Sequence, residues 1–453
     1  MEKKKLGLLN HIGLGVGSAI GTGIFMMLGY GIAYTGRSII LVCALGCILM
    51  FLAFWYSGAM GSLFVLKGGD YTARSMVFPP LMTGVSAWFQ IVSCFVLAGH
   101  SLAIAQFAGK VVPWIAEHQA ISAMCILILG FLCAIKGSKV LATIQNFIVV
   151  ALVIALALFV FYGVPKVDFA AFFSNADGGF LKGGIGGFVS ALSVMSFACM
   201  GTAGNTALAI DTENPKRTIP LSSFIVTAIV GVIYGFMAYV AAGILPYEQI
   251  AGQNISVTAE VIMPQAPYLF FVVGGGIFAI SSTMLSCIAV MSNPIVSVSE
   301  DGWIPKAFQK KTKSGIPWFT YIVMFAVSCI PILTGLDVEG VIGNVMVPTM
   351  IVNTYINFYC IKLPDLYPKQ WEKRGVRYPR WLWNLFSVVG GVFAIVVIYN
   401  TFINMSPTAM IICVIEVAAM FGFSFLTLKK GWVSKEQLAA SKQAAIQDAI
   451  SVE

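Results

Sequence analysis

Charged residues are scarce in this chain of 453 residues, because Asp, Glu, Lys and Arg together make up only 10% of it. Soluble domains carry about 25%. Apolar residue types supply 58% before the 45 glycines are counted, and the mean hydropathy is +0.89. So few charged groups cannot cover that much apolar surface in water. The composition therefore excludes a soluble enzyme, a nucleic-acid-binding protein and a secreted disulfide scaffold, and it predicts a polytopic membrane protein embedded in a lipid bilayer.

Patterns that bind metals or nucleotides are also missing from the sequence. The three histidines, His11, His100 and His118, lie on separate segments and form no metal-binding pair. The ten cysteines contain no CxxC pair and fall in apolar stretches, where we interpret them as small buried side chains. No Walker sequence occurs, so ATP does not drive the protein. We therefore expect neither an intramembrane enzyme nor a bound cofactor.

Apolar runs long enough to cross a bilayer recur along the chain. A hydrocarbon core of about 30 Å needs about 20 residues of helix. Runs of this kind between charged residues, Pro or Gly predict an all-α protein with about twelve transmembrane helices. They lie near residues 8–32, 38–66, 81–109, 120–136, 140–163, 185–208, 219–245, 267–298, 316–335, 338–361, 382–404 and 408–428.

Lys and Arg are distributed unevenly between the two sides of these spans. If the N-terminal residues 1–7 are cytoplasmic, 23 of the 27 Lys and Arg residues fall on the cytoplasmic side. Cytoplasmic loops of membrane proteins carry such an excess. We therefore expect both termini in the cytoplasm and the protein in the cell membrane. In the tail, 429–453, Ser434 and Gln437 form a capping box that predicts a short polar helix.

The first span is unusually rich in glycine. Gly13, Gly17 and Gly21 keep the small-xxx-small spacing, so close packing between helices is one explanation. Gly15 and Gly23 lie off that face, however, and so much glycine destabilises a helix. Unwound backbone inside a membrane persists only where it lines a cavity. The pattern therefore indicates a break whose free N–H groups offer an anion site.

A second glycine-rich interruption occurs in the sixth span, where Gly201 and Gly204 lie in the sequence SFACMGTAGNT. A pair of interrupted helices at matching places in two halves indicates a transporter site. The first and sixth spans each open a set of five, residues 8–163 and 185–361. Because five is odd, the second set enters the membrane from the opposite side. This predicts an inverted five-plus-five repeat, followed by two additional helices over 382–428.

Four motifs in order carry a resemblance to a known family. They are GSAIGTGIF (17–25), KGGDYTAR (67–74), GTAGNTALAIDTENPKRTIP (201–220) and SEDGWIPKAF (299–308). Together they resemble the amino acid–polyamine–organocation transporters, over most of residues 8–360. The resemblance implies a fold of the leucine-transporter type, alternating access and an amino-acid-like substrate.

The resemblance also implies a substrate site at the two breaks. The family holds the substrate carboxylate with backbone N–H groups of the first break, here Gly21, Thr22 and Gly23. Main-chain carbonyls hold the ammonium, and the matching positions are Ala19, Ile20, Phe197, Ala198 and Met200. Phe197, four residues before Gly201, matches the family's lid over the substrate, with a lipid-facing Phe as the alternative. Uncharged walls would come from Ile20, Ile24, Cys199, Met200 and Ser286.

Ion or proton coupling has few candidates in this sequence. The fifth span has no charge after Gln145, so the lysine that several subfamilies place there is missing. His100 either titrates near the site or is a hydrogen-bonded packing residue. Ser282 and Ser286 either bind Na⁺ or donate to their own helix backbone. Glu416 lies outside both repeats, where we expect a bundle-edge or dimer contact rather than a proton relay.

These observations predict a secondary transporter, a permease or exchanger, of amino acids. The walls carry no charge, so we expect neutral substrates. A Na⁺- or H⁺-coupled symporter of another small organic solute, such as an amine, is the alternative. A receptor that only senses its ligand would have the same sequence features, and transport assays separate the two. The oligomeric state is left open by the sequence.

Overall fold

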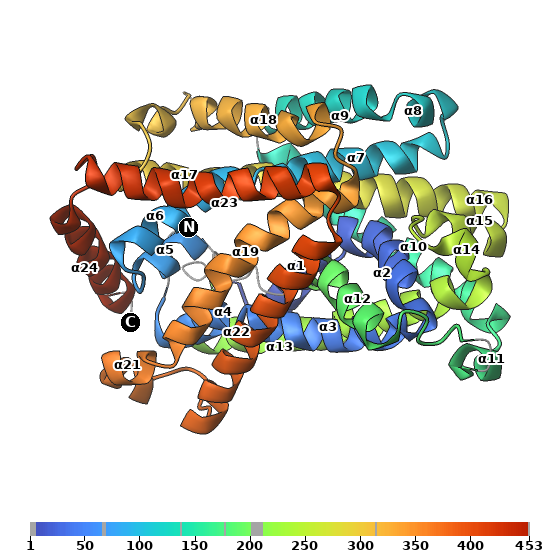
Figure 1. Ribbon diagram of the computed structural model, residues 1–453, viewed down its shortest axis with the longest axis horizontal. Helices are drawn as coiled ribbons and strands as arrows, with labels where there is room; N and C mark the ends of the chain where they lie inside the picture. Colours follow the sequence, from blue (N-terminus) through green and yellow to red (C-terminus); the bar gives the residue numbers. More distant parts are fainter. Residues whose placement is uncertain are drawn as a thin grey trace.

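The computed structural model describes residues 6–65, 69–135, 138–175, 178–200, 212–312 and 315–451, which form a bundle of helices (Figure 1). The longer helices are α1 Leu8–Ala19, α2 Leu28–Thr35, α3 Ile39–Ala53, α4 Trp55–Leu63, α6 Pro80–Val92, α7 Phe95–Gly109, α9 Gln119–Ile135, α10 Ser138–Gly163, α12 Gly184–Cys199, α13 Pro215–Ile244, α17 Phe278–Glu300, α18 Trp318–Leu333, α19 Val338–Cys360, α22 Arg380–Asn404, α23 Pro407–Lys429 and α24 Lys435–Ser451. The shorter ones are α5 Gly69–Ser75, α8 Pro113–Glu117, α11 Phe169–Phe173, α14 Tyr247–Ile250, α15 Ser256–Ile262, α16 Gln265–Phe270, α20 Leu363–Leu366 and α21 Pro368–Glu372.

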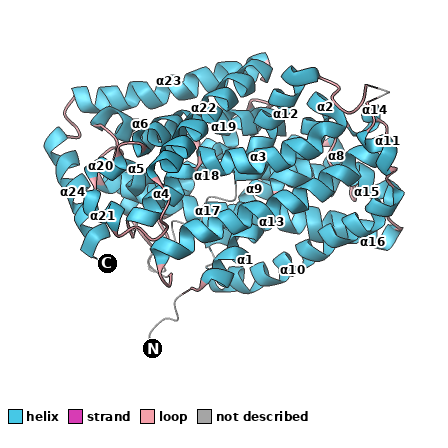
Figure 2. Cartoon of the chain, turned by 90° about the horizontal axis from the view of Figure 1, so that it is seen from below, coloured by secondary structure: helices cyan, strands magenta, loops and turns pink. Residues whose placement is uncertain are grey.

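The all-helical membrane fold predicted from the sequence is confirmed. Eight helical stretches of the described chain are long and apolar enough to cross a membrane, and four shorter apolar helices accompany them. Each of the predicted spans coincides with one of these helices or contains part of it. Figure 2 shows helices and loops throughout the described residues, which form no strand beyond a single bridge between Leu6 and Thr212.

The two ends of the bundle carry different short elements. α20, α21 and α24 lie at one end, and α8, α11 and α14–α16 lie at the other (Figures 1 and 2). The tail helix α24 begins as the capping box predicts, because the Gln437 N–H donates to Ser434 Oγ at 3.0 Å. The Gln437 side chain instead reaches the carbonyl of Asp301 at 3.4 Å.

The predicted break in the first span is confirmed. α1 ends at Ala19, and the next residue, Ile20, has extended backbone with φ −89° and ψ 108°. Helix resumes as a short π-helix, η1 Gly23–Met27, which runs into α2. π-helical turns occur often at functional sites. The sixth span follows α12 to Met200, and the predicted break at Gly201 and Gly204 lies outside the described residues.

The sequence did not predict three further interruptions. The second span divides at Phe54 into α3 and α4, and the third divides at Ser93 and Cys94 into α6 and α7. The eighth contains a π-helix, η5 Phe271–Ile277, before α17. Its glycines allow close approach, since a Cβ atom on Gly276 would lie 2.3 Å from the Phe107 ring. η5 therefore packs tightly on α7, the helix that carries His100.

Candidate functional site

The first break packs directly against the end of α12. A Cβ atom on Gly23 would lie 2.4 Å from Ala198 Cα, closer than real Cβ atoms approach. A Cβ atom on Gly21 would lie 2.6 Å from Thr283 Oγ1 of α17. Neither glycine has a positive φ. These positions therefore need glycine for space rather than for backbone conformation, and the contacts bring the first, sixth and eighth spans together.

One tyrosine of α13 joins the first break to the end of α12. The Tyr234 hydroxyl lies 2.8 Å from the carbonyl oxygen of Ala19 and 3.2 Å from that of Ala198. Its side chain is fully buried. The hydroxyl has one proton to donate, so it alternates between these two carbonyls or shares the proton between them. Sequence reasoning missed Tyr234, because nothing in one sequence distinguishes it among 15 tyrosines.

The start of η1 is a helix N-terminus at the first break. The first N–H groups of a helix have no partner within that helix, and the helix dipole makes this end favourable for negative charge. Here that end begins at Thr22, whose φ of −49° and ψ of −37° are already helical. Thr22 and Gly23 are buried. This geometry suits a carboxylate, as the sequence predicts for Gly21, Thr22 and Gly23.

His100 contacts the same break from α7. Its Nδ1 atom lies 2.7 Å from Thr22 Oγ1, and its Nε2 atom lies 3.7 Å from the Cys287 sulfur of α17. The imidazole and the Phe197 ring have centroids 6.4 Å apart. Only 2% of the residue is exposed. The hydrogen-bonded histidine expected as one alternative is therefore present, and it is bonded to the candidate site itself.

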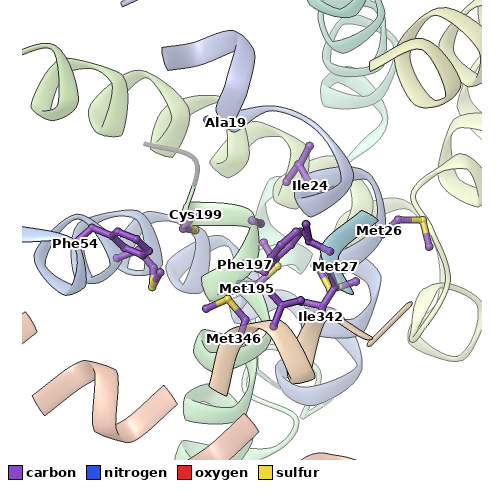
Figure 3. Close-up of a cluster of buried hydrophobic side chains, with 14 of the residues drawn as sticks. Ala19, Ile24, Met26, Met27, Phe54, Met195, Phe197, Cys199, Ile342 and Met346 are labelled. Atoms are coloured by element: carbon purple, nitrogen blue, oxygen red, sulfur yellow. The ribbon is translucent and has the colours of Figure 1, made fainter. Parts of the chain in front are cut away.

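Phe197 points into the bundle. It is 8% exposed, so the alternative of a lipid-facing side chain is wrong. Figure 3 shows its ring among Met27, Met195, Ile342 and Met346, which belong to the same buried cluster. These neighbours are apolar and come from η1, α12 and α19. The ring therefore lies between the first break and α19, where a lid over the break would lie.

A cavity of about 310 Å³ lies between η1, α12, α19 and the end of α22. Met27, Ile342 and Met346, which surround Phe197, also line it. Its polar lining includes two carboxylates, and Tyr34 of α2 donates to one of them, Glu339 Oε1, at 3.0 Å. Sequence reasoning missed this cavity. Its remaining lining comes from Ser193, Val194, Asp337, Gly340, Gly343, Thr401, Asn404, Met405 and Ser406.

The other predicted residues fall into three groups. Ala19, Ile20, Ile24, Ala198 and Cys199 are buried around the first break and at the end of α12. Met200, which ends α12, is half-buried, and Gly201 lies outside the described residues. Ser282 is buried and Ser286 is half-buried on α17.

The structure bears on two expectations about polar residues. Thr283, beside Ser282, donates to the Ala279 carbonyl of its own helix at 3.0 Å, as the alternative to Na⁺ binding predicts for this stretch. Glu416 was expected at the edge of the bundle, but it is only 6% exposed. Its carboxylate oxygens have no hydrogen-bond partner among the described groups. Glu416 is thus buried between helices of its own chain rather than presented to a second copy.

This helical bundle, with an interrupted first helix held against the sixth, defines a polytopic membrane carrier. A family model described as amino acid permease matches residues 6–421. The chain therefore belongs to the amino acid permease family, and it is a transporter rather than an enzyme.

The relatives have low sequence identity to this chain, but they match it over about two thirds or more of its length. A D-serine/D-alanine/glycine transporter of Escherichia coli is 26% identical over 68% of this chain and 68% of its own length. A branched-chain amino acid permease of Bacillus subtilis is 24% identical over 70% of this chain and 72% of its own length. A histidine permease of Lactococcus lactis is 25% identical over 71% of this chain and 71% of its own length. This protein is thus an amino acid transporter.

Proposed function

We propose that the protein is a secondary transporter that moves neutral amino acids across the cell membrane by alternating access. The observation that carries this proposal is the Tyr234 hydroxyl, which lies within hydrogen-bond distance of the Ala19 and Ala198 carbonyls. The ends of α1 and α12 thus present carbonyl oxygens to one point. Beside that point, the start of η1 presents N–H groups.

A zwitterion fits this pair of backbone ends. Its carboxylate accepts hydrogen bonds from the N–H groups of Gly21, Thr22 and Gly23. Its ammonium donates to the carbonyls of Ala19 and Ala198, together with those of Ile20, Phe197 and Met200 as the family resemblance implies. Each carbonyl has two lone pairs, so it accepts from the ammonium and from Tyr234 together. Fixed charges at this depth would cost several kcal/mol each, whereas backbone dipoles need none.

The substrate side chain should be uncharged. Ile20, Ile24, Cys199, Met200 and Phe197 surround the breaks, and none carries a charge. A second charge on the substrate would lose its hydration without gaining a partner, at a cost of several kcal/mol. The relatives named above as transporters of D-serine, D-alanine and glycine and of branched-chain amino acids support this choice.

Both termini should lie in the cytoplasm. The Lys- and Arg-rich segment that contains α20 and α21 lies at the same end of the bundle as α24 (Figure 1). This arrangement supports the positive-inside assignment. The cavity beside Asp337 and Glu339 then opens from the outer half of the protein.

Purified protein in proteoliposomes tests the proposal. The vesicles are loaded with unlabelled L-alanine, and entry of labelled L-alanine is followed with competitors outside. We expect counterflow, because only a carrier exchanges solute, and strong competition by alanine, serine and valine. Arginine, lysine, glutamate and agmatine should compete weakly. Binding without counterflow would indicate a receptor, and dominant competition by agmatine would indicate an amine transporter instead.

A further inference from the structure

We propose that His100 binds one proton when a substrate carboxylate binds at the first break, so that an amino acid is carried together with H⁺. This inference rests on the proposed function. The observation behind it is the pair of contacts that the imidazole makes, 2.7 Å from Nδ1 to Thr22 Oγ1 and 3.7 Å from Nε2 to the Cys287 sulfur. Thr22 thereby belongs both to the carboxylate site, through its N–H group, and to the histidine, through its hydroxyl.

The Thr22 hydroxyl supplies the link between the two events. Without substrate, His100 is neutral, with its proton on Nε2 towards Cys287, and its Nδ1 accepts from the Thr22 O–H. A hydronium ion then transfers a proton to Nδ1, so that the N–H bond forms as the hydronium O–H bond breaks and water is left. The new Nδ1–H donates to Thr22 Oγ1, because a hydroxyl both donates and accepts. The hydroxyl proton turns away from the ring and donates to the carboxylate bound at the break.

Electrostatics makes each event favour the other. A buried imidazolium is costly, and the positive end of the η1 dipole beside Thr22 disfavours a cation further. A carboxylate at that helix end offsets both the cost of burying the imidazolium and its repulsion by the dipole, since an opposite charge within about 4–6 Å favours the charged form of a titratable group. By thermodynamic linkage, proton binding then strengthens carboxylate binding by the same factor.

Few other titratable groups surround the imidazole in the described part of the chain. Cys287 contacts it, while α19 places Val341 and Ile342 beside the preceding residue, Gly99. The charged side chains of the helices packed against α7 lie at or near helix ends, and the contacts of His100 with described residues include none of them, so a substrate carboxylate at the first break would supply the anion beside it. These charged side chains are Glu117 of α8, Glu300 of α17 and Glu339 of α19. The other titratable groups on the helices around His100 are His11 of α1, Cys125 and Cys133 of α9, Cys199 of α12, Tyr321 and Cys329 of α18, and Tyr355, Tyr359 and Cys360 of α19.

The cavity of about 310 Å³ comes close to the backbone next to His100. Ile342 lines it and also packs against Gly99, where a Cβ atom would lie 3.2 Å from Ile342 Cδ1. Asp337 and Glu339 on the cavity wall raise the local concentration of cations, including H⁺. One side-chain layer of α19 thus separates this acidic cavity from the backbone next to His100.

Proteoliposomes that enclose a pH-sensitive dye test the coupling. L-Alanine is added outside at equal internal and external pH, with the membrane potential clamped. We expect the wild type to acidify the lumen in proportion to labelled alanine uptake. His100→Gln keeps a hydrogen-bonding side chain but cannot be protonated, so the ratio of H⁺ to alanine should fall at least about tenfold. Because the ratio is internal to each variant, it separates lost coupling from slower transport.

Thr22 gives a second, independent arm. Thr22→Val removes the hydroxyl at nearly constant volume and should lower the same ratio, whereas Thr22→Ser keeps the hydroxyl and should restore it. His118→Gln is the matched control, because His118 is exposed and stacks on Trp114. It should leave transport and coupling unchanged.

Three results would overturn the inference. Wild-type counterflow without acidification would refute proton coupling and leave the proposed function intact. An unchanged ratio in His100→Gln, or in Thr22→Val, would refute the assignment to this pair of residues. Absence of counterflow in the wild type would refute the proposed function and the coupling with it.

Discussion

Gly23 and Gly21 should respond differently to the same added methyl group. A Cβ atom on Gly23 would lie 2.4 Å from Ala198 Cα and 2.8 Å from Ala198 Cβ. Carbon atoms in contact prefer about 3.5–4.0 Å, so the backbone of α12 would have to move by about 1 Å. Overpacking typically costs about 1–3 kcal/mol. We therefore expect Gly23→Ala to lower transport at least about tenfold, since 1.4 kcal/mol corresponds to that factor.

At Gly21, the atom in the way is the end of a side chain. Its added Cβ atom would lie 2.6 Å from Thr283 Oγ1 but 3.5 Å from Thr283 Cβ, which is ordinary contact. Thr283→Ala should therefore rescue Gly21→Ala, with a coupling energy of about 1–3 kcal/mol in a double-mutant cycle. Ala198→Gly should not rescue Gly23→Ala, because the clash with Cα remains.

Initial rates of labelled alanine uptake, with thermal melts of the purified protein as a folding control, measure both effects. Gly422→Ala in α23 is the matched control, since a Cβ atom there meets nothing within 4 Å. It should leave uptake unchanged and keep or slightly raise the stability, because Ala favours a helix over Gly by up to about 1 kcal/mol. Normal uptake by Gly23→Ala, or rescue of it by Ala198→Gly, would refute the contact between the first break and α12.

Three further predictions follow from single side chains. Phe197→Ala should raise the apparent substrate constant or stop turnover without changing expression, whereas an equal loss in Phe173→Ala would show an unspecific effect. Tyr234→Phe should lower the Tm of the substrate-free protein, because a buried carbonyl without its donor costs about 1–3 kcal/mol; an unchanged Tm would contradict this role. Burial raises the pKa of Asp301 above 3.8, although hydrogen bonds from Tyr71 and Ser441 oppose the shift. The folded chain then holds this proton more tightly than the unfolded chain, so stability falls as pH rises from 3.8 through the raised value. Asp301→Asn should lessen that fall of Tm, and parallel curves would count against it.

Glycine made the first break predictable from the sequence. Gly15 and Gly23 lie off the face that packing would use, and helix with so much glycine is unstable. The structure places the break one to three residues before Gly23, as expected. The length and apolar character of each run likewise made the helices predictable, because the bilayer fixes how long a span must be.

The partners that hold the break were not predictable in this way. The bonds from Tyr234 to Ala19 and from His100 to Thr22 join residues 215 and 78 positions apart. They depend on how helices cross, which periodicity does not specify. Asp337 and Glu339 begin the tenth span, where acidic residues at a helix start fit an ordinary first turn. Only the fold places them on a cavity wall beside the cluster around Phe197.

A structure of the protein with bound L-alanine tests most directly whether the amino acid binds between the first break and the end of α12. We predict a carboxylate oxygen within about 3 Å of the backbone nitrogens of Thr22 and Gly23, and an ammonium within about 3 Å of the Ala19 carbonyl. The Phe197 ring should cover the ligand. L-Alanine bound instead in the cavity beside Asp337 and Glu339 would contradict this account, if the first break then holds no ligand and the Tyr234 hydroxyl keeps its bonds to the Ala19 and Ala198 carbonyls.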